Sequence, residues 1–183
     1  KSEKVFKKLD NFEEKSTKYS SKFIHSLIHL GKYNEAYKYS KKLEKKNIAN
    51  FESNLFLGLY EFKEENYLKS KFYFDKLENN FSHQLIFDIL KTSLNSWTEL
   101  AQSKEKEKIK LIDMSNPGYK NIVSIQKVFA HCYIGSVDTE QNFKKIIENE
   151  KSNFSRYSFF FANYLLNNNK RTESVEFINL ASK

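Results

Sequence analysis

Two histidines one helical turn apart come closest, in this sequence, to a chemical site. His25 and His29 are separated by three residues, so on a helix both imidazoles lie on one face, as zinc ligands often do. A zinc site needs at least a third protein ligand. Cys132 and His83 belong to other segments of the sequence and have no matching placement. We therefore interpret both histidines as structural or surface residues and expect no metal site.

The single cysteine has no histidine placed to act as its base, so we do not expect it to be a nucleophile. His131 directly precedes Cys132, so on a helix the two side chains face different directions, and we expect Cys132 to pack as a small apolar residue. Adjacent carboxylates, as at Glu64 and Glu65, fall in lysine-rich segments and indicate solvated surface. The sequence lacks a glycine-rich phosphate loop, a G-x-S-x-G elbow and an H-E-x-x-H motif. We predict that the chain is not an enzyme and needs no cofactor.

The elements that position these residues follow from a repeat in the sequence. Gly31–Ala36 is echoed 34 residues later by Glu65–Ser70, and Asn169–Ser174 echoes the same segment near the C-terminus. Further equivalent pairs are Tyr33 and Tyr67, Tyr39 and Tyr73, and Leu43 and Leu77. A period of this length is typical of stacked helical hairpins. The chain has only four glycines and one proline, and this scarcity of turn formers also favours an all-α fold.

On these residues the sequence resembles a tetratricopeptide repeat protein. The matching features are an aromatic residue before the second helix (Tyr33, Tyr67), a small residue early in that helix (Ala36, Ser70) and Gly58 in the first helix. The resemblance implies an all-α, right-handed α-α superhelix, or solenoid, of antiparallel helix-turn-helix repeats. In this family the first helices of the units line a concave surface.

We predict one repeat domain over residues 1–183. Its parts are a trailing second helix at 1–14, repeats at 17–50 and 51–82, divergent repeats at 83–116 and 117–151, and a C-terminal repeat at 154–183. Within the divergent part, helices are expected at 83–100, 104–114, 122–133 and 138–149. The chain is expected to begin inside a second helix and to end in a second helix at Ala181, without the polar capping helix that such arrays need for solubility. We therefore expect it to be a segment of a longer array.

The net charge suggests nucleic acid or a membrane as a partner, but the scarcity of arginine does not favour either. The formal net charge of +8 raises nucleic acid or an anionic membrane as a partner. However, Arg156 and Arg171 are the only arginines among the 31 basic residues, whereas phosphate recognition favours arginine. A lysine excess typical of an AT-rich genome is the simpler interpretation. No apolar run reaches the roughly 18 residues of a membrane span. The compartment, cytoplasmic or periplasmic, and the oligomeric state stay open.

The candidate site is the concave face that the resemblance implies. The single tryptophan is a candidate anchor, although packing between hairpins is the favoured interpretation for it. The candidate residues are Ser21, His25, Ile28, His29, Leu55, Leu59, Phe62, Lys63 and Trp97. Their apolar members suit an apolar or amphipathic helix lying in a groove, or equally packing against neighbouring helices of the array. Ser21 and His25 stand where a clamp for a chaperone's C-terminal carboxylate would have Lys and Asn, so that activity is not expected.

Our leading prediction is a non-catalytic protein–protein interaction scaffold that binds a peptide or a partner domain. Two alternatives stay open. Helical-hairpin repeats can also read single-stranded RNA, although lysines here are distributed through the second helices and linkers, as at Lys38, Lys41 and Lys45. The segment could also be a structural or regulatory spacer of a larger protein.

Overall fold

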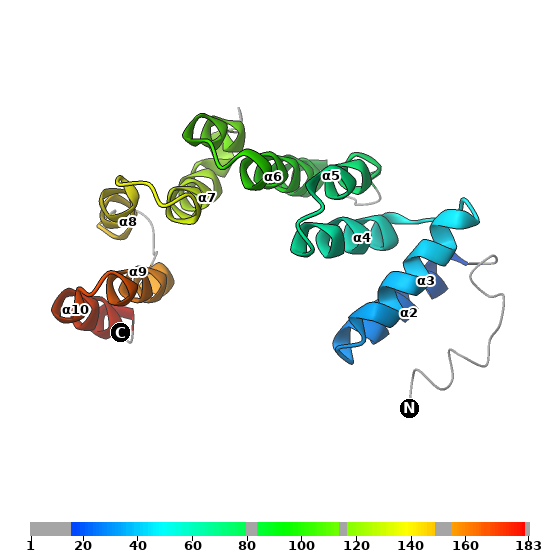
Figure 1. Ribbon diagram of the computed structural model, residues 1–183, viewed down its shortest axis with the longest axis horizontal. Coiled ribbons are helices and arrows are strands. Elements are labelled where there is room, and N and C mark those ends of the chain that lie inside the picture. Colours follow the sequence, from blue (N-terminus) through cyan, green and yellow to red (C-terminus); the bar gives the residue numbers. More distant parts are fainter. Residues whose placement is uncertain (1–15, 80–83, 114–116, 149–154, 182–183) are drawn as a thin grey trace. The chain divides into compact units, whose positions relative to one another are not determined.

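The chain is helical throughout the part that the structure describes. This computed structural model describes residues 16–79, 84–113, 117–148 and 155–181 (Figure 1). No strand occurs among these residues, so the predicted all-α class is confirmed. The chain divides into two compact units, residues 1–102 and 103–183, which are described separately. The segment predicted as a helix at 1–14 lies outside the described residues, and the division into six repeat parts stays a prediction.

Each unit is built from successive short helices. The first unit contains α2 (Thr17–His29), α3 (Tyr33–Lys45), α4 (Phe51–Lys63), α5 (Tyr67–Asp75) and α6 (Gln84–Ser103). The second contains η2 (Lys106–Ile112), η3 (Pro117–Tyr119), α7 (Lys120–Tyr133), α8 (Thr139–Ile147), α9 (Ser155–Asn167) and α10 (Arg171–Ala181). Helices adjacent in sequence pack as pairs, α2 with α3, α4 with α5, α7 with α8 and α9 with α10. None of the described helices is both long enough and apolar enough to cross a bilayer.

One predicted helix has a different geometry. The segment expected at 104–114 forms the 3₁₀-helix η2 instead of an α-helix. A 3₁₀-helix has three residues per turn, so residues three apart lie on one side of it. Ile109 and Ile112 have this spacing and are both buried, whereas Leu111 is only partly buried. The expected helices at 83–100, 122–133 and 138–149 are present as α6, α7 and α8.

Side chains cap the N-termini of α2 and α4, the first helix of each pair in the first unit. The Oγ of Ser16 accepts a hydrogen bond from the backbone N–H of Tyr19 at 3.4 Å. Asn50 and Ser53 form a capping box, in which Asn50 Oδ1 accepts from the Ser53 N–H at 2.9 Å and Ser53 Oγ accepts from the Asn50 N–H at 2.8 Å. Ser16 and Asn50 lie 34 residues apart, so α2 and α4 begin at the same point of the sequence period.

The turn inside each helix pair has the same backbone geometry at four places. Gly31, Glu65, Gly135 and Asn169 have φ values of 70°, 60°, 68° and 62°. At each turn this residue's N–H donates to the carbonyl three residues earlier, and the following N–H donates to the carbonyl five residues earlier, with N–O distances of 2.8–3.1 Å. This is the Schellman pattern, which satisfies the last carbonyls of a helix. Within each unit the two turns lie 34 residues apart.

Glu65 is expected to weaken its own turn. Its φ of 60° is in the left-handed region, where a Cβ is strained and glycine is not. We expect Glu65→Gly to raise the free energy of unfolding by about 0.5–1 kcal/mol, measured by urea denaturation. Glu64→Gly is the matched control, because Glu64 has an ordinary φ of −82° and should lose stability instead. Equal loss in both variants would contradict the left-handed turn.

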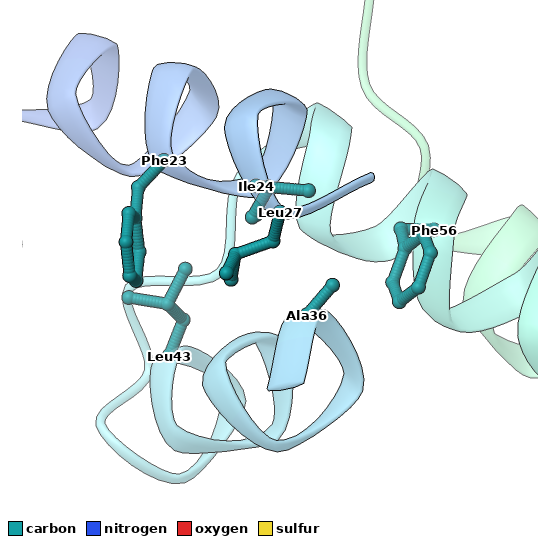
Figure 2. Packing of buried hydrophobic residues seen from close by; sticks show 6 residues of the cluster. All are labelled: Phe23, Ile24, Leu27, Ala36, Leu43 and Phe56. Atoms are coloured by element: carbon teal, nitrogen blue, oxygen red, sulfur yellow. The ribbon is translucent and has the colours of Figure 1, made fainter. Parts of the chain in front are cut away.

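The core of the first unit begins between α2 and α3. Phe23, Ile24 and Leu27 of α2 point toward Ala36 and Leu43 of α3 (Figure 2). Phe56 of α4 belongs to the same cluster, so α2 packs against both α3 and α4. Ala36 is fully buried in this cluster. A small residue at this position lets the two helices approach.

Two further clusters of buried side chains lie among the described residues. Phe51, Phe74, Leu77 and Phe87 form the second core of the first unit and bring together α4, α5 and α6. In the second unit, side chains of α7, α8 and α9 form a core that contains Val128, Phe143, Phe161 and Leu165. Each core therefore links consecutive helices along the chain.

Candidate interaction surface

Eight of the nine predicted site residues lie on two helices that contact each other. Ser21, His25, Ile28 and His29 are on α2, and the other four, Leu55, Leu59, Phe62 and Lys63, are on α4. We call these eight residues the α2–α4 face. Trp97 lies on α6, where it is partly buried, and does not belong to this face.

Ser21 joins the two helices. Its Oγ donates a hydrogen bond to the Glu52 carboxylate at 2.8 Å and accepts one from the Asn50 side-chain amide at 3.0 Å. The same amide donates to the carbonyl of Thr17 at 3.2 Å. Asn50 also caps α4, so one residue fixes both the start of α4 and its position beside α2. In this structure Ser21 orients the α2–α4 face.

Three apolar residues of the α2–α4 face are only partly exposed. Ile28 packs partly against the first core and Leu55 against the second. The Phe62 ring contacts Tyr67 at a centroid distance of 5.6 Å. All three are half-buried, which matches the alternative that part of the apolar set packs within the fold. Leu59 differs, because 46% of it is exposed.

The other exposed residues of the α2–α4 face are two histidines and a lysine. His25, His29 and Lys63 are exposed members of the face, and Lys18 and Lys22 are exposed on α2 next to them. On α2 these residues recur at helical spacing along one side. Lys63 pairs with the exposed Glu64 at 3.7 Å, and the partly buried Glu52 accepts a hydrogen bond from Ser21. The face therefore combines an apolar centre with positive charge and imidazole donors.

A buried polar network holds α4 in place beneath this face. The Glu61 carboxylate is buried and accepts hydrogen bonds from the Tyr37 hydroxyl at 2.7 Å and from the Asn66 amide at 3.0 Å. Because a tyrosinate here would meet that carboxylate, the hydrogen bond to Glu61 raises the pKa of Tyr37 to about 12. Tyr60 donates to Asn34 at 2.9 Å. These bonds tie α4 to α3 and the following turn, and so orient Leu59.

The second unit has a corresponding face that the sequence analysis missed. Gly135 lies 104 residues after Gly31 and forms the same turn, so α7 has the register of α2. On this register the residues at the places of Lys18, Ser21, His25 and His29 are apolar or aromatic, namely Ile122, Ile125, Phe129 and Tyr133. The Phe129 ring contacts Phe160 at 5.3 Å and Tyr157 at 6.1 Å, both on α9. The matching glycines Gly31 and Gly135 are the sequence signal that could have revealed it.

An open pocket lies away from the predicted site. It has a volume of about 450 Å³ and is found at the turn between α4 and α5, beside the end of α6. The lining residues are Glu65, Asn66, Tyr67, Leu68, Lys69 and Gln102. None of them is a predicted site residue, and the side chains do not form a catalytic constellation.

The chemistry-bearing residues are not assembled for metal binding or nucleophilic attack within the described ranges. No three His, Cys, Asp or Glu side chains gather there as a metal site requires. Cys132 packs against the core of the second unit, as predicted, and burial raises the pKa of its thiol. A raised pKa disfavours the thiolate, which is the reactive form. Burial also lowers the pKa of the neighbouring His131.

Comparisons with known proteins do not identify a family. No family model matches the chain, and neither the curated proteins nor the solved structures contain a match.

Proposed function

We propose that this chain is a tetratricopeptide-type scaffold, a right-handed α-α superhelix without catalytic activity, that binds a peptide or partner domain. The α2–α4 face is the proposed binding surface. Its mixture of exposed Leu59 with lysine and histidine suits an amphipathic peptide that carries acidic residues beside an apolar stripe. The observation that carries the proposal is the gathering of eight candidate residues on two helices that contact each other, with Leu59, His25, His29 and Lys63 exposed.

Recurring geometry supports the repeat part of this proposal. The turns at Gly31 and Glu65, and at Gly135 and Asn169, have one backbone conformation and one spacing. A second recurring feature is a hydrogen bond from a small residue of the second helix to the first helix. Ser70 donates to the carbonyl of Gly58 at 2.9 Å, and Ser174 donates to the carbonyl of Ala162 at 2.9 Å. Repeated local contacts of this kind are what a solenoid requires.

The test is a single charge placed at the centre of the face. We expect Leu59→Asp to reduce recovery of bound protein by about tenfold or more, because a carboxylate would be buried against an apolar, acidic partner. Binding is measured by pull-down from lysate and then with the purified partner. Leu68→Asp is the matched control, because Leu68 is 74% exposed on α5 and lies outside the α2–α4 face.

An equal partner set for wild type, Leu59→Asp and Leu68→Asp would remove the α2–α4 face as the binding surface. A salt-sensitive affinity for single-stranded RNA that Leu59→Asp leaves unchanged would favour the RNA-binding alternative instead.

A further inference from the structure

In the first unit, polar side chains hold α3 and α5 side by side. Tyr73 of α5 is 3% exposed, and its hydroxyl accepts a hydrogen bond from Lys41 Nζ of α3 at 2.8 Å. The same hydroxyl donates to the Glu44 carboxylate of α3 at 3.1 Å, and Lys76 of α5 lies 3.8 Å from that carboxylate. The second helices of two successive pairs are therefore joined along one edge.

The sides of α3 and α5 that face away from their partner helices carry exposed residues. On α3, Ala36 and Leu43 are buried against α2, and on α5, Ser70 donates to the Gly58 carbonyl of α4. Residues two positions from a buried residue lie about half a turn around the helix from it. The exposed residues on these far sides include Lys38 and Lys42 of α3 and Leu68, Lys69, Phe72 and Lys76 of α5. Because α3 and α5 lie side by side, these six residues form one surface, which we call the α3–α5 surface.

Two large apolar side chains project from the α3–α5 surface one helical turn apart. Leu68 is 74% exposed and Phe72 is 50% exposed. Lys76 lies over the Phe72 ring, with Nζ 4.0 Å from the ring centroid. The apolar side chains of α5 therefore lie directly beside ammonium groups, as in helices that bind at a membrane interface.

The charge of the α3–α5 surface is positive. Among the described residues, Lys38 and Lys69 form no ion pair with a carboxylate. Two bordering carboxylates, Glu35 and Asp75, pair with lysines outside the surface at 3.3 and 4.0 Å. Glu65 is exposed at the turn before α5, at one end of the surface, and the four lysines outnumber it. An anionic molecule is therefore the complementary occupant.

The rest of the chain is poorly suited to cover this surface. The neighbouring helices in the sequence, α2, α4 and α6, pack on other sides of α3 and α5. Residues 103–183 carry 13 basic and 9 acidic residues, and residues 1–15 carry five and four. Both segments have a net positive charge, so the lysines of the α3–α5 surface repel them on average. The charge favours an anionic occupant from outside the chain.

We propose that the α3–α5 surface docks on an anionic lipid surface, with its lysines among the headgroups and Leu68 and Phe72 inserted at the boundary with the acyl chains. A diffusely charged membrane attracts lysine by its charge alone, without the bidentate geometry for which arginine is preferred. The scarcity of arginine disfavours specific phosphate recognition but does not count against this contact. Binding at the interface also requires no membrane-spanning helix.

The two apolar side chains favour lipid over an acidic protein or a nucleic acid. A stable protein interface has a desolvated core built from many side chains, and two apolar residues among lysines supply little of one. A nucleic acid is attracted to the lysines, but it gives Leu68 no apolar environment. Shallow insertion into a membrane interface satisfies both the charge and the apolar residues.

The test is co-sedimentation of the full chain with vesicles of equimolar phosphatidylserine and phosphatidylcholine. We expect saturable binding to these vesicles and little binding to vesicles of phosphatidylcholine alone. The double variant Lys38→Glu/Lys69→Glu should weaken the binding by about tenfold or more, because two attractive charges become repulsive. Lys110→Glu/Lys145→Glu is the matched control, since both lysines are exposed in the second unit and the net charge changes equally. The control should lose much less affinity.

Phe72→Gln tests insertion separately. We expect it to weaken vesicle binding by about tenfold, because an apolar ring no longer leaves water, while the net charge is unchanged. Leu85→Gln is its matched control, because Leu85 is 57% exposed on α6 and lies outside the α3–α5 surface. Circular dichroism checks that the variants fold, and Leu68→Gln replaces Phe72→Gln if that variant does not.

Three results would overturn the proposal. They are no binding to the phosphatidylserine vesicles, an equal loss in the two lysine double variants, and binding that Phe72→Gln leaves unchanged while single-stranded RNA competes with the vesicles. The first would leave an acidic protein as the occupant, the second would mean that only net charge matters, and the third would indicate a nucleic acid. None of them affects the outcome of Leu59→Asp, because Leu59 lies on α4. Leu68→Asp stays a valid control for partner binding, because the assay with the purified partner contains no lipid.

Discussion

Phe161→Ala is expected to lower the free energy of unfolding of the second unit by about 3–5 kcal/mol, which is the usual cost of emptying a buried phenylalanine site. Phe161 is fully buried in the core of that unit. Its ring stacks on Phe143 of α8 at 5.1 Å and meets Phe177 of α10 edge-on at 4.6 Å. Removing the ring leaves a cavity among three helices, and the aromatic contacts on both sides are lost together.

Phe159→Ala is the matched control for this prediction. Phe159 is two residues away on the same helix and is 61% exposed, so its removal creates little cavity. We expect a change of about 0.5 kcal/mol or less, typical of surface substitutions. Urea denaturation followed by circular dichroism measures both variants. Similar losses in the two would mean that α9 does not bury Phe161 between α8 and α10.

The sequence predicted the local fold where its composition or its 34-residue repeat carried the information. The scarcity of glycine and proline predicted an all-helical chain, and the 34-residue echo placed Gly31 and Glu65 at equivalent points, which the structure gives the same turn. Glu65 shows why periodicity was the better guide there, since glutamate alone does not indicate a left-handed residue. The 3₁₀ geometry of η2 was not predictable in the same way, because isoleucines at a spacing of three fit either kind of helix.

The candidate site was predicted in part for the same reason. The period placed His25 and Leu59 at equivalent points of α2 and α4, and the structure has these helices in contact. The bond from Ser21 to Glu52 depends on how closely the two helices approach, which no spacing in the sequence contains. The exposure of Phe159 likewise depends on what packs against it. Leu55, which lies 104 residues earlier in the sequence, is an equally apolar residue that is half-buried.

Gly58→Ala tests the close approach of α4 and α5, and here two effects oppose each other. In an isolated helix the substitution stabilises by about 1 kcal/mol, because alanine is the better helix former. In this structure a Cβ on Gly58 would overlap Cε1 of Phe74, a ring that is 1% exposed and has little room to move. Overpacking of a filled core typically costs about 1–3 kcal/mol. We expect the clash to dominate and the first unit to lose about 1–2 kcal/mol.

A double-mutant cycle with Phe74→Leu identifies the cause. Phe74→Leu alone should destabilise by creating space, and in its presence Gly58→Ala should become neutral or stabilising, since the Cβ then has room. The coupling free energy, read from urea denaturation, should be about 1 kcal/mol or more in favour of the double mutant. Additive effects, or a Gly58→Ala variant that is more stable than wild type, would contradict the close approach.

The result also bears on binding, because Gly58 directly precedes Leu59. The contact that brings α5 against α4 fixes the side of α4 from which Leu59 projects.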